Sequence, residues 1–351
     1  MTTTPTPAAC SACFVDRGLC LDAEELGVDV HGLCPRCGKA EGRKLSKNIL
    51  LELAFRFFVW GSLWRVDYGA APLIQFNDKQ RTSIEPSPWL RHDVTVFEDI
   101  LGIGFFHYGP RLWMVGEVEP LKALQGESTR PAVVSRILRE YPTRSIGPST
   151  FLYRIRKEPM EPAAAREYDS PPAGVMGAGR LDSAGNPMLY ASPDLQVCVH
   201  ECRVTAEDEL YVATLIPARE LRLLDLSALL KEHVTEFESL DMAVHMLFLA
   251  GEHAYKVSRE IALAARGEGF DGIVYPSYFS LLRNGVMPFQ TVYGISHRRI
   301  PQFQACEEAS SVPNLAIFGR PVESGTLEVK CINKLVLSRV AYEFRFGPVG
   351  F

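Results

Sequence analysis

Two pairs of closely spaced cysteines constrain the start of the chain. Two residues separate the members of each pair, and twenty residues separate the pairs: Cys10 and Cys13, then Cys34 and Cys37. This spacing lets both thiolates of a pair reach one tetrahedral ion from a tight turn, and two pairs fill every position of a closed zinc site. The pattern predicts a structural zinc ion in a ribbon over residues 10–40. Four unrelated reduced thiols are the alternative; Cys20 and His31 are candidate substitute ligands, and we expect both to be bystanders.

A ribbon of this size buries little core, so the metal would supply its folding energy. The whole chain has 351 residues, which is long enough for two domains. Its hydrophobic content of 47% and charged content of 23% are ordinary for a globular protein. The net charge of −5 gives no positive field for a long phosphate backbone, and we therefore expect no nucleic-acid partner.

The N-terminal residues indicate no targeting segment. The sequence MTTTPTPAAC lacks the basic region and apolar run of a secretory signal. The most apolar early segment, residues 49–60, contains Glu52 and Arg56 and is shorter than the ~20 residues of a membrane span. Nine cysteines are compatible with a reducing compartment. We expect a cytoplasmic protein without a membrane partner.

Composition and turn signals divide the rest of the chain. Residues 1–9 form a Thr/Pro tail that we expect to be disordered. Residues 41–149 predict a largely helical accessory domain, in which residues 45–64 have apolar side chains spaced as in a helix covered on most sides. The loop at 142–149 marks the boundary of a catalytic domain over residues 150–351. This last domain mixes strands and helices, which predicts an α+β fold.

Several elements of the last domain follow from local patterns. We expect one helix over residues 242–266, ended by Gly-Glu-Gly. The expected strands cover residues 151–157, 210–217, 221–226, 273–275, 314–318, 327–338 and 340–346. Side chains alternate across a strand, so Arg154 and Arg156 face away from Tyr153.

The central stretch, residues 174–203, predicts a strand, an arginine after glycines, a turn, a short strand and a helix. Ser192-Pro193 is a helix-start signal, because the hydroxyl can cap free N–H groups and proline tolerates the first helical position. On that helix Leu195, Cys198, Val199 and Cys202 share one face. Glu201 lies on the flank of that face, so a rigid element carries its carboxylate out of the core.

Six pieces of the sequence resemble the RES domain, a family named for an arginine, a glutamate and a serine. They are Tyr153-Arg154 in FLYRIRK, Arg180 in GAGRLDSAG, Tyr190 in MLYAS, Glu201 in VHECR, Ser277 in EGFDGIVYPS and Asn314 in VPNLAIF. The resemblance covers about residues 150–345. It implies an ADP-ribosyltransferase-like mixed sheet with flanking helices, and an activity that degrades NAD⁺.

The resemblance also implies roles for these residues. Glu201, Arg154 and Arg180 would be catalytic, and Tyr153, Tyr190, Ser277 and Asn314 would bind NAD⁺. Cleavage of the nicotinamide–ribose bond passes through an oxocarbenium-like state, which a nearby carboxylate stabilises. A guanidinium binds pyrophosphate with two parallel hydrogen bonds. Arg156 is an alternative to Arg154, and the order Tyr-Arg favours Arg154.

Arg180 follows Gly177-Ala178-Gly179, where missing side chains would let a ligand approach the backbone. A β-bulge is the alternative explanation of these glycines. Many relatives of this layout carry a HEPN-like domain in front, and some such domains are ribonucleases with an Arg-x(4–6)-His pair. None of the eight histidines has an arginine at that distance, so we assign no ribonuclease activity to the extension.

Three functions follow from the resemblance. The first is an NAD⁺ glycohydrolase or phosphorylase, a toxin held silent by an antitoxin or regulatory protein. The second is an ADP-ribosyltransferase that modifies a macromolecule; Val199, two positions before Glu201, stands where arginine-directed transferases have an acidic or amide residue, and this favours water or phosphate as the acceptor. The third is an inactive partner-binding module. The sequence leaves the oligomeric state open, a homo-oligomer included.

Overall fold

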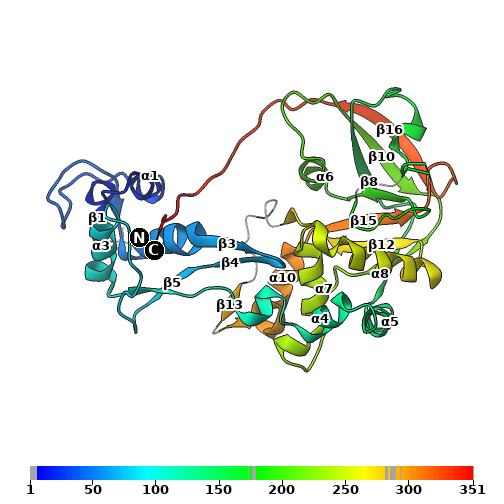
Figure 1. The fold of residues 1–351 in the computed structure, drawn as a ribbon. Coiled ribbons are helices and arrows are strands. Elements are labelled where there is room, and N and C mark those ends of the chain that lie inside the picture. Colours follow the sequence, from blue (N-terminus) through cyan, green and yellow to red (C-terminus); the bar gives the residue numbers. More distant parts are fainter. Residues whose placement is uncertain are drawn as a thin grey trace. The chain divides into compact units, whose positions relative to one another are not determined.

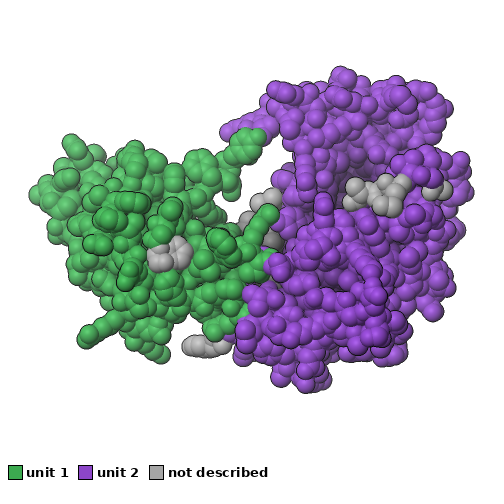
Figure 2. Space-filling view, in the orientation of Figure 1, with its two compact units in different colours: residues 1–66, 70–111, 341–351 green, residues 67–69, 112–340 purple. Residues whose placement is uncertain are grey.

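The protein is described from a computed structural model, which covers residues 6–172, 174–175, 179–280, 284, 290–292 and 294–350. The chain forms two compact units (Figure 2). The first comprises Met1–Val66, Ala70–Arg111 and Ala341–Phe351, and the second comprises Asp67–Gly69 and Leu112–Val340. Within the described residues, no helix has the length and apolar character that crossing a membrane requires.

The first unit combines short helices with short strands. In chain order they are β1 (Ala9–Cys10), η1 (Ser11–Cys13), α1 (Arg17–Leu26), β2 (Lys44–Leu45), α2 (Lys47–Ala54), η2 (Phe55–Val59), η3 (Trp60–Ser62), β3 (Leu63–Val66), β4 (Gly69–Pro72), β5 (Ile74–Asn77), α3 (Arg91–Leu101) and β6 (Gly104–His107). The strands pair as three two-stranded sheets, β1–β2, β3–β4 and β5–β6, of which the first and the last are antiparallel.

One aromatic core holds this unit together, and the paired cysteines belong to it. Phe58 contacts Phe105 at a ring-centroid distance of 4.1 Å and meets Phe97 edge-on at 5.8 Å. Cys10 and Cys13 are buried in the same cluster. The expected boundary at residue 40 therefore does not separate two cores, and the segment between the cysteine pairs contains the helix α1.

The prediction of one widely covered helix over residues 45–64 was wrong. The α-helix ends at Ala54 and continues as one π-helical and one 3₁₀ turn, and the chain then enters β3. Leu50 and Leu53 are buried, whereas Leu51 and Phe55 are exposed, so the core covers only one side of α2.

Both ends of the chain depart from the expectations. Residues 1–5 of the predicted tail lie outside the described residues, while Ala8 donates a backbone hydrogen bond to Leu45 and Ala9 pairs with it. The predicted strand at 340–346 does not form. Instead Phe346 packs against the core of the first unit, and the chain at Gly347 passes so close to Gly61 that neither position has room for a Cβ atom.

The second unit contains most of the regular structure. In chain order the elements are η4 (Leu112–Val115), α4 (Glu119–Gln125), α5 (Arg130–Glu140), β7 (Thr143–Ile146), β8 (Leu152–Lys157), η5 (Ala165–Tyr168), β9 (Met188–Ala191), α6 (Leu195–Glu201), β10 (Leu210–Pro217), β11 (Leu221–Asp225), η6 (Glu236–Glu238), α7 (Leu240–Leu249), η7 (Glu252–Ala254), α8 (Tyr255–Gly267), β12 (Gly272–Pro276), β13 (Thr291–Val292), β14 (Ile295–Ser296), η8 (His297–Arg299), η9 (Pro301–Phe303), α10 (Gln304–Ser310), β15 (Pro313–Phe318) and β16 (Leu327–Leu335).

Two sheets pack face to face in this unit. One has the order β16-β10-β8 and the other β7-β11-β12-β15-β9, in which only β11 and β12 run parallel. Leu152 and Leu215 from the first sheet share a core with Leu223 and Leu315 from the second. Helix α6 covers the other face of the smaller sheet, and α7 and α8 pack on β12 (Figure 1). The predicted α+β fold with a mixed sheet and flanking helices is confirmed.

Helices α4 and α5 pack on α7 and α8 within the second unit. The compact unit consequently begins at Leu112, apart from Asp67–Gly69, and not at the loop of residues 142–149 where the sequence placed a domain boundary.

The predicted single helix over residues 242–266 is two helices. Helix α7 ends at Leu249, and α8 begins at Tyr255 after a 3₁₀ turn. Gly251 interrupts the helical pattern, since glycine in a helix interior costs roughly 1 kcal/mol relative to alanine. The break leaves backbone carbonyls at the end of α7 without helical N–H partners.

Candidate functional site

Helix α6 carries Glu201 as its last residue. The N-cap is Asp194, whose carboxylate accepts hydrogen bonds from the backbone N–H groups of Gln196 and Val197 at 2.8 and 3.0 Å. The predicted start at Ser192-Pro193 was therefore two residues early, because a carboxylate caps the helix. The Ser192 hydroxyl instead donates to the carbonyl of Pro313 in β15.

Two donors from the larger sheet hold the Glu201 carboxylate. Ser277, the first residue after β12, donates its hydroxyl to Oε1 at 2.6 Å. Asn314, in β15, donates from Nδ2 to the same oxygen at 2.6 Å. Across the described residues the other oxygen, Oε2, makes no hydrogen bond. Two donors from the larger sheet thus fix one oxygen of the carboxylate.

The surroundings of Glu201 act on its ionisation in opposite directions. The residue has a solvent-exposed surface, yet protein atoms crowd its carboxylate on other sides, and this desolvation raises the pKa above its ordinary value. The hydrogen bonds from Ser277 and Asn314 and the charges of Arg180 and Arg203 lower the pKa and offset part of the effect. The net effect is a raised pKa, and the partial desolvation strengthens the attraction of the ionised carboxylate for a developing positive charge.

Arg180, in the loop before β9, is one of two arginines whose charges act on this carboxylate. Its guanidinium donates to the carbonyl of Leu247 at 3.0 Å and to that of Ala250 at 2.8 Å. These carbonyls are available because the helix breaks after α7. The same guanidinium lies 4.8 Å from the ring centroid of Tyr255. Within the part of the chain that the structure describes, no carboxylate forms an ion pair with Arg180, so its charge is available to an anionic ligand.

Tyr190 fixes the loop that carries Arg180. Its hydroxyl donates to Asp182 Oδ1 at 2.8 Å and accepts from the backbone N–H of Leu181 at 2.9 Å. Burial raises the pKa of Tyr190, so the hydroxyl stays protonated. A Cβ atom on Gly179 would lie 2.6 Å from this hydroxyl. Gly179 is therefore needed for packing; Gly177 and Ala178 lie outside the described residues.

Arg154 is buried away from this carboxylate. Its guanidinium donates to the carbonyl of Tyr190 at 2.9 Å and to that of Asp169 at 3.0 Å. Desolvation lowers the pKa of Arg154 to about 9. Arg156 lies on the same side of β8, as the alternation predicts, and donates to the same Asp169 carbonyl at 2.8 Å. These contacts give Arg154 a structural task, joining β8 to β9 and to the chain at Asp169.

Tyr153 faces the opposite side of β8. It packs against the apolar face of α6, together with Cys198 and Val199. Helical spacing predicted that face; Cys198 is buried, and Leu195, Val199 and Cys202 pack partly buried against the same cluster. The structure therefore brings Glu201, Arg180, Ser277 and Asn314 together, attaches Tyr190 to them through the loop, and places Tyr153 under the helix.

Sequence reasoning missed one residue of this group, Tyr275. It pairs with Asn314 across β12 and β15, and burial raises its pKa well above the ordinary value. The charges of Glu201 and Arg180 both act on this buried phenol. The signal was present, because Tyr275 and Ser277 are two residues apart and alternation along an extended chain puts them on one side.

The four paired cysteines of the first unit fit a tetrahedral metal ion. Their sulfur atoms all lie within 4.8 Å of one another. The Sγ–Sγ distances are 3.8 Å for Cys10–Cys13 and 3.6 Å for both Cys10–Cys37 and Cys13–Cys34. Zn–S bonds of ~2.3 Å in a tetrahedron require S–S separations of about 3.8 Å. The distances far exceed the ~2.05 Å of a disulfide.

The surroundings of the cluster also suit thiolate ligands. Burial raises the pKa of Cys10 to about 11. For Cys34 burial acts in the same direction, but hydrogen bonds from the backbone N–H groups of Cys37 and Arg36 outweigh it and lower the pKa to about 7. Asp93 in α3 accepts from the N–H groups of Val15 and Asp16 and so holds the chain after the first pair.

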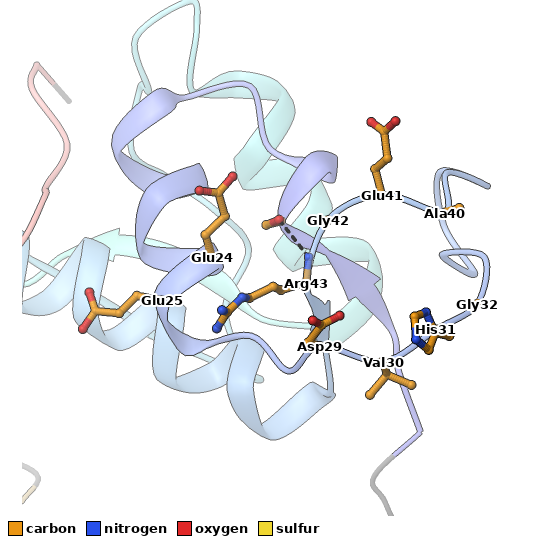
Figure 3. Close-up of a pocket in the computed structure, with 11 residues that line it drawn as sticks. Glu24, Glu25, Asp29, Val30, His31, Gly32, Ala40, Glu41, Gly42 and Arg43 are labelled. Atoms are coloured by element: carbon orange, nitrogen blue, oxygen red, sulfur yellow. Dashed lines mark hydrogen bonds between the residues drawn. The ribbon is translucent and has the colours of Figure 1, made fainter.

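An open depression of about 730 Å³ lies in the first unit, between the end of α1 and the loops at residues 29–32 and 40–43. Figure 3 shows Glu24, Glu25 and Asp29 around Arg43. The backbone N–H of Arg43 donates to Ser11 at 3.2 Å, and its side chain reaches the Gly27 carbonyl. None of the residues around Glu201 lines this depression.

Comparisons with known proteins point to one family. Residues 151–313 match the family model of the RES domain. Among solved structures, the chain is similar to one in the crystal structure of the M. tuberculosis MbcT-MbcA toxin-antitoxin complex, with a TM-score of 0.34 and 16% sequence identity over 63% of this chain and 94% of that one. No curated protein matches the sequence.

Proposed function

Because this chain carries a RES domain over residues 151–313, we propose that it cleaves the nicotinamide–ribose bond of NAD⁺. The observation that supports the proposal is the Glu201 carboxylate, whose Oε1 is held by hydrogen bonds from both Ser277 and Asn314. Bond cleavage develops positive charge on the ribose, and a fixed carboxylate stabilises that charge more in the transition state than in the ground state.

The remaining residues bind and orient the dinucleotide. Arg180 offers its charge to the pyrophosphate while two carbonyls keep the guanidinium in place. Tyr190 keeps the loop of Arg180 in position. Ser277 and Asn314 act through the carboxylate that they orient. Arg154 supports the site by donating a hydrogen bond to the Tyr190 carbonyl. Tyr153 supports it by packing against α6, the helix that carries Glu201.

A small molecule is the acceptor that we propose for the ADP-ribosyl group. Val199, two positions before Glu201, packs into the apolar contact between α6 and β8. That position cannot direct a protein side chain to the reaction, which favours water or phosphate over a macromolecule. Hydrolysis would release ADP-ribose, and phosphorolysis would release its phosphorylated form.

Depletion of NAD⁺ would make the protein a toxin of a toxin–antitoxin or phage-defence system. The RES resemblance implies a restraining antitoxin or regulatory protein that covers the NAD⁺ site. We assign residues 41–149 to accessory functions, either covering the catalytic domain or recognising a partner. The reaction would take place where NAD⁺ is abundant, in the cytoplasm.

In the first unit we propose a structural zinc ion bound by Cys10, Cys13, Cys34 and Cys37. The sulfur separations support this assignment. Four protein ligands leave no open position, so the ion stabilises the fold and takes no part in the reaction.

One assay tests the proposed reaction against its alternatives. The purified chain is incubated with NAD⁺, with and without phosphate and with cell lysate, and nicotinamide and ADP-ribose are followed. Free ADP-ribose indicates hydrolysis, a phosphate requirement indicates phosphorolysis, and label on macromolecules indicates an ADP-ribosyltransferase. If protein shown to be free of a bound partner releases no nicotinamide, the proposal fails and a partner-binding module remains.

A further inference from the structure

We propose that Ser258 and Arg259 of α8 are positioning residues for the reaction, because they fix the backbone of Arg180 and so the place of its guanidinium. This inference rests on the proposed function for its kinetic consequence only. The restraint on Arg180 can be tested without turnover.

Two side chains of α8 donate hydrogen bonds to the backbone at Arg180. The Ser258 hydroxyl donates to the Arg180 carbonyl at 2.7 Å, a closer contact than the 3.1 Å to the Tyr255 carbonyl of its own helix. The Arg259 guanidinium donates to the Gly179 carbonyl from Nη2 at 2.8 Å and from Nε at 3.3 Å. Ser258 is fully buried and Arg259 is half-buried, so water replaces these donors poorly.

These bonds fix both peptide groups that flank Arg180. Arg259 holds the group before it through the Gly179 carbonyl. Ser258 holds the group after it through the Arg180 carbonyl, and the N–H of that same group donates to the Tyr190 hydroxyl. Because peptide groups are planar, fixing the two groups sets φ and ψ of Arg180 and the direction in which its side chain leaves the backbone.

The same face of α8 also contacts the Arg180 side chain. Tyr255, Ser258 and Arg259 stand at i, i+3 and i+4, which places them on one face of the helix. The guanidinium carbon of Arg180 lies 4.8 Å from the centroid of the Tyr255 ring, and that of Arg259 lies 5.7 Å from it. The described residues provide neither guanidinium with a carboxylate partner. Two like charges near one ring repel each other, so Arg180 keeps its place through the hydrogen bonds and not through an ion pair.

The first experiment compares Arg259→Ala and Arg259→Lys with Arg266→Ala. Arg266 also lies on α8, but it donates to the Asn186 side chain at 2.6 Å and so controls for the loss of an α8 arginine. In Arg259→Ala we expect the KM for NAD⁺ to rise about fivefold with kcat nearly unchanged, because a loosely held Arg180 binds the pyrophosphate less well. Arg259→Lys keeps a donor and a charge and should recover most of the loss. Arg266→Ala should leave KM in place, and an equal rise in both alanine variants would overturn the inference.

A double-mutant cycle separates positioning from direct contact with the substrate. If Arg259 acts through Arg180, adding Arg259→Ala to Arg180→Ala raises KM no further, since no guanidinium is left to position. KM increases that multiply would overturn the inference and show that Arg259 binds the substrate itself. Ser258→Ala changes less of the helix and repeats the same cycle should Arg259→Ala not fold.

The readout without turnover is the ¹⁵N NMR signal of the Arg180 guanidinium, assigned by its loss in Arg180→Ala. Its protons exchange slowly with water while they are bonded to the two carbonyls after α7. Exchange should become severalfold faster in Arg259→Ala and stay unchanged in Arg266→Ala. Exchange at the parent rate in both Arg259→Ala and Ser258→Ala would overturn the inference even if NAD⁺ is cleaved. If the parent cleaves no NAD⁺ but exchange accelerates, the proposed function fails and the positioning role holds.

Discussion

Ser277 donates a 2.6 Å hydrogen bond to Oε1 of Glu201 and thereby joins the end of β12 to the end of α6. These elements lie on different sheets of the second unit, since α6 packs on β8 and β12 belongs to the larger sheet. The Glu201 carboxylate, on the helix that packs against the smaller sheet, is therefore held by a donor from the larger sheet. Its orientation consequently depends on the packing of the whole domain, and not on the helix alone.

Removal of this bond should change the pH dependence of the reaction. The Ser277 hydroxyl stabilises the ionised carboxylate, so Ser277→Ala raises the already elevated pKa of Glu201 further. Activity requires the ionised form and is lost as the pH falls through that pKa. We expect the activity of the parent to fall at an acidic pH above ~4.5, the ordinary pKa of a glutamate. In Ser277→Ala the fall should occur at higher pH, so that the variant is about tenfold less active than the parent in that range.

The control for this measurement is Ser280→Ala. Ser280 is also buried in the same segment, but its hydroxyl donates to the Val312 carbonyl and makes no bond to Glu201. Equal displacement of the acid limb in both variants would contradict the role given to Ser277.

The two arginines that the sequence grouped together should behave differently. Arg154→Ala removes the guanidinium donor from the Tyr190 carbonyl and leaves the Asp169 carbonyl to Arg156, and we expect the free energy of unfolding to fall by roughly 1–3 kcal/mol. Arg180→Ala should instead raise the KM for NAD⁺ about tenfold or more, because it removes a charge available to the pyrophosphate. Denaturant unfolding and steady-state kinetics measure the two effects.

Arg219→Ala provides the matched control, since Arg219 is an exposed arginine paired with Asp271. It should change neither quantity appreciably. A KM effect confined to Arg154→Ala, with Arg180→Ala unaffected, would reverse the assignment.

Loss of the metal should unfold more of the first unit than residues 10–40. Cys10, Cys13 and Cys34 are buried in the same core as Phe58 and Phe97. We therefore expect elemental analysis of Cys13→Ser to show one zinc less per chain. We also expect the whole first unit to unfold, α3 included. Hydrogen exchange should show lost protection in α2 and α3; protection retained there, with loss limited to residues 10–40, would contradict this expectation.

The sequence predicted which side chains form the site better than it predicted the elements that hold them in place. Glu201, Ser277 and Asn314 were grouped because the sequence pieces around them resemble the RES domain, and they lie within hydrogen-bond distance. The strands around them follow from local alternation. The break after α7 was marked only by Gly251, and the need for free carbonyls beneath Arg180 exists only in three dimensions.

The surroundings of other residues also depend on contacts that only the folded chain makes. Tyr153 and Arg154 are adjacent in the sequence but lie on opposite faces of β8, which separates their surroundings. The apolar residues near the C-terminus read as a closing strand because their partner could not be seen locally. Phe346 packs against the core of the first unit, a contact between the two ends of the chain.

The most direct test of the account is nicotinamide release from NAD⁺ by the parent and by Glu201→Gln. The glutamine keeps the shape and a hydrogen-bond acceptor for Ser277, so the fold should persist, which circular dichroism and the melting temperature verify. We predict that the parent releases nicotinamide and that the variant is slower by about a thousandfold or more. A variant that folds normally and releases nicotinamide at close to the parent rate would contradict the central claim.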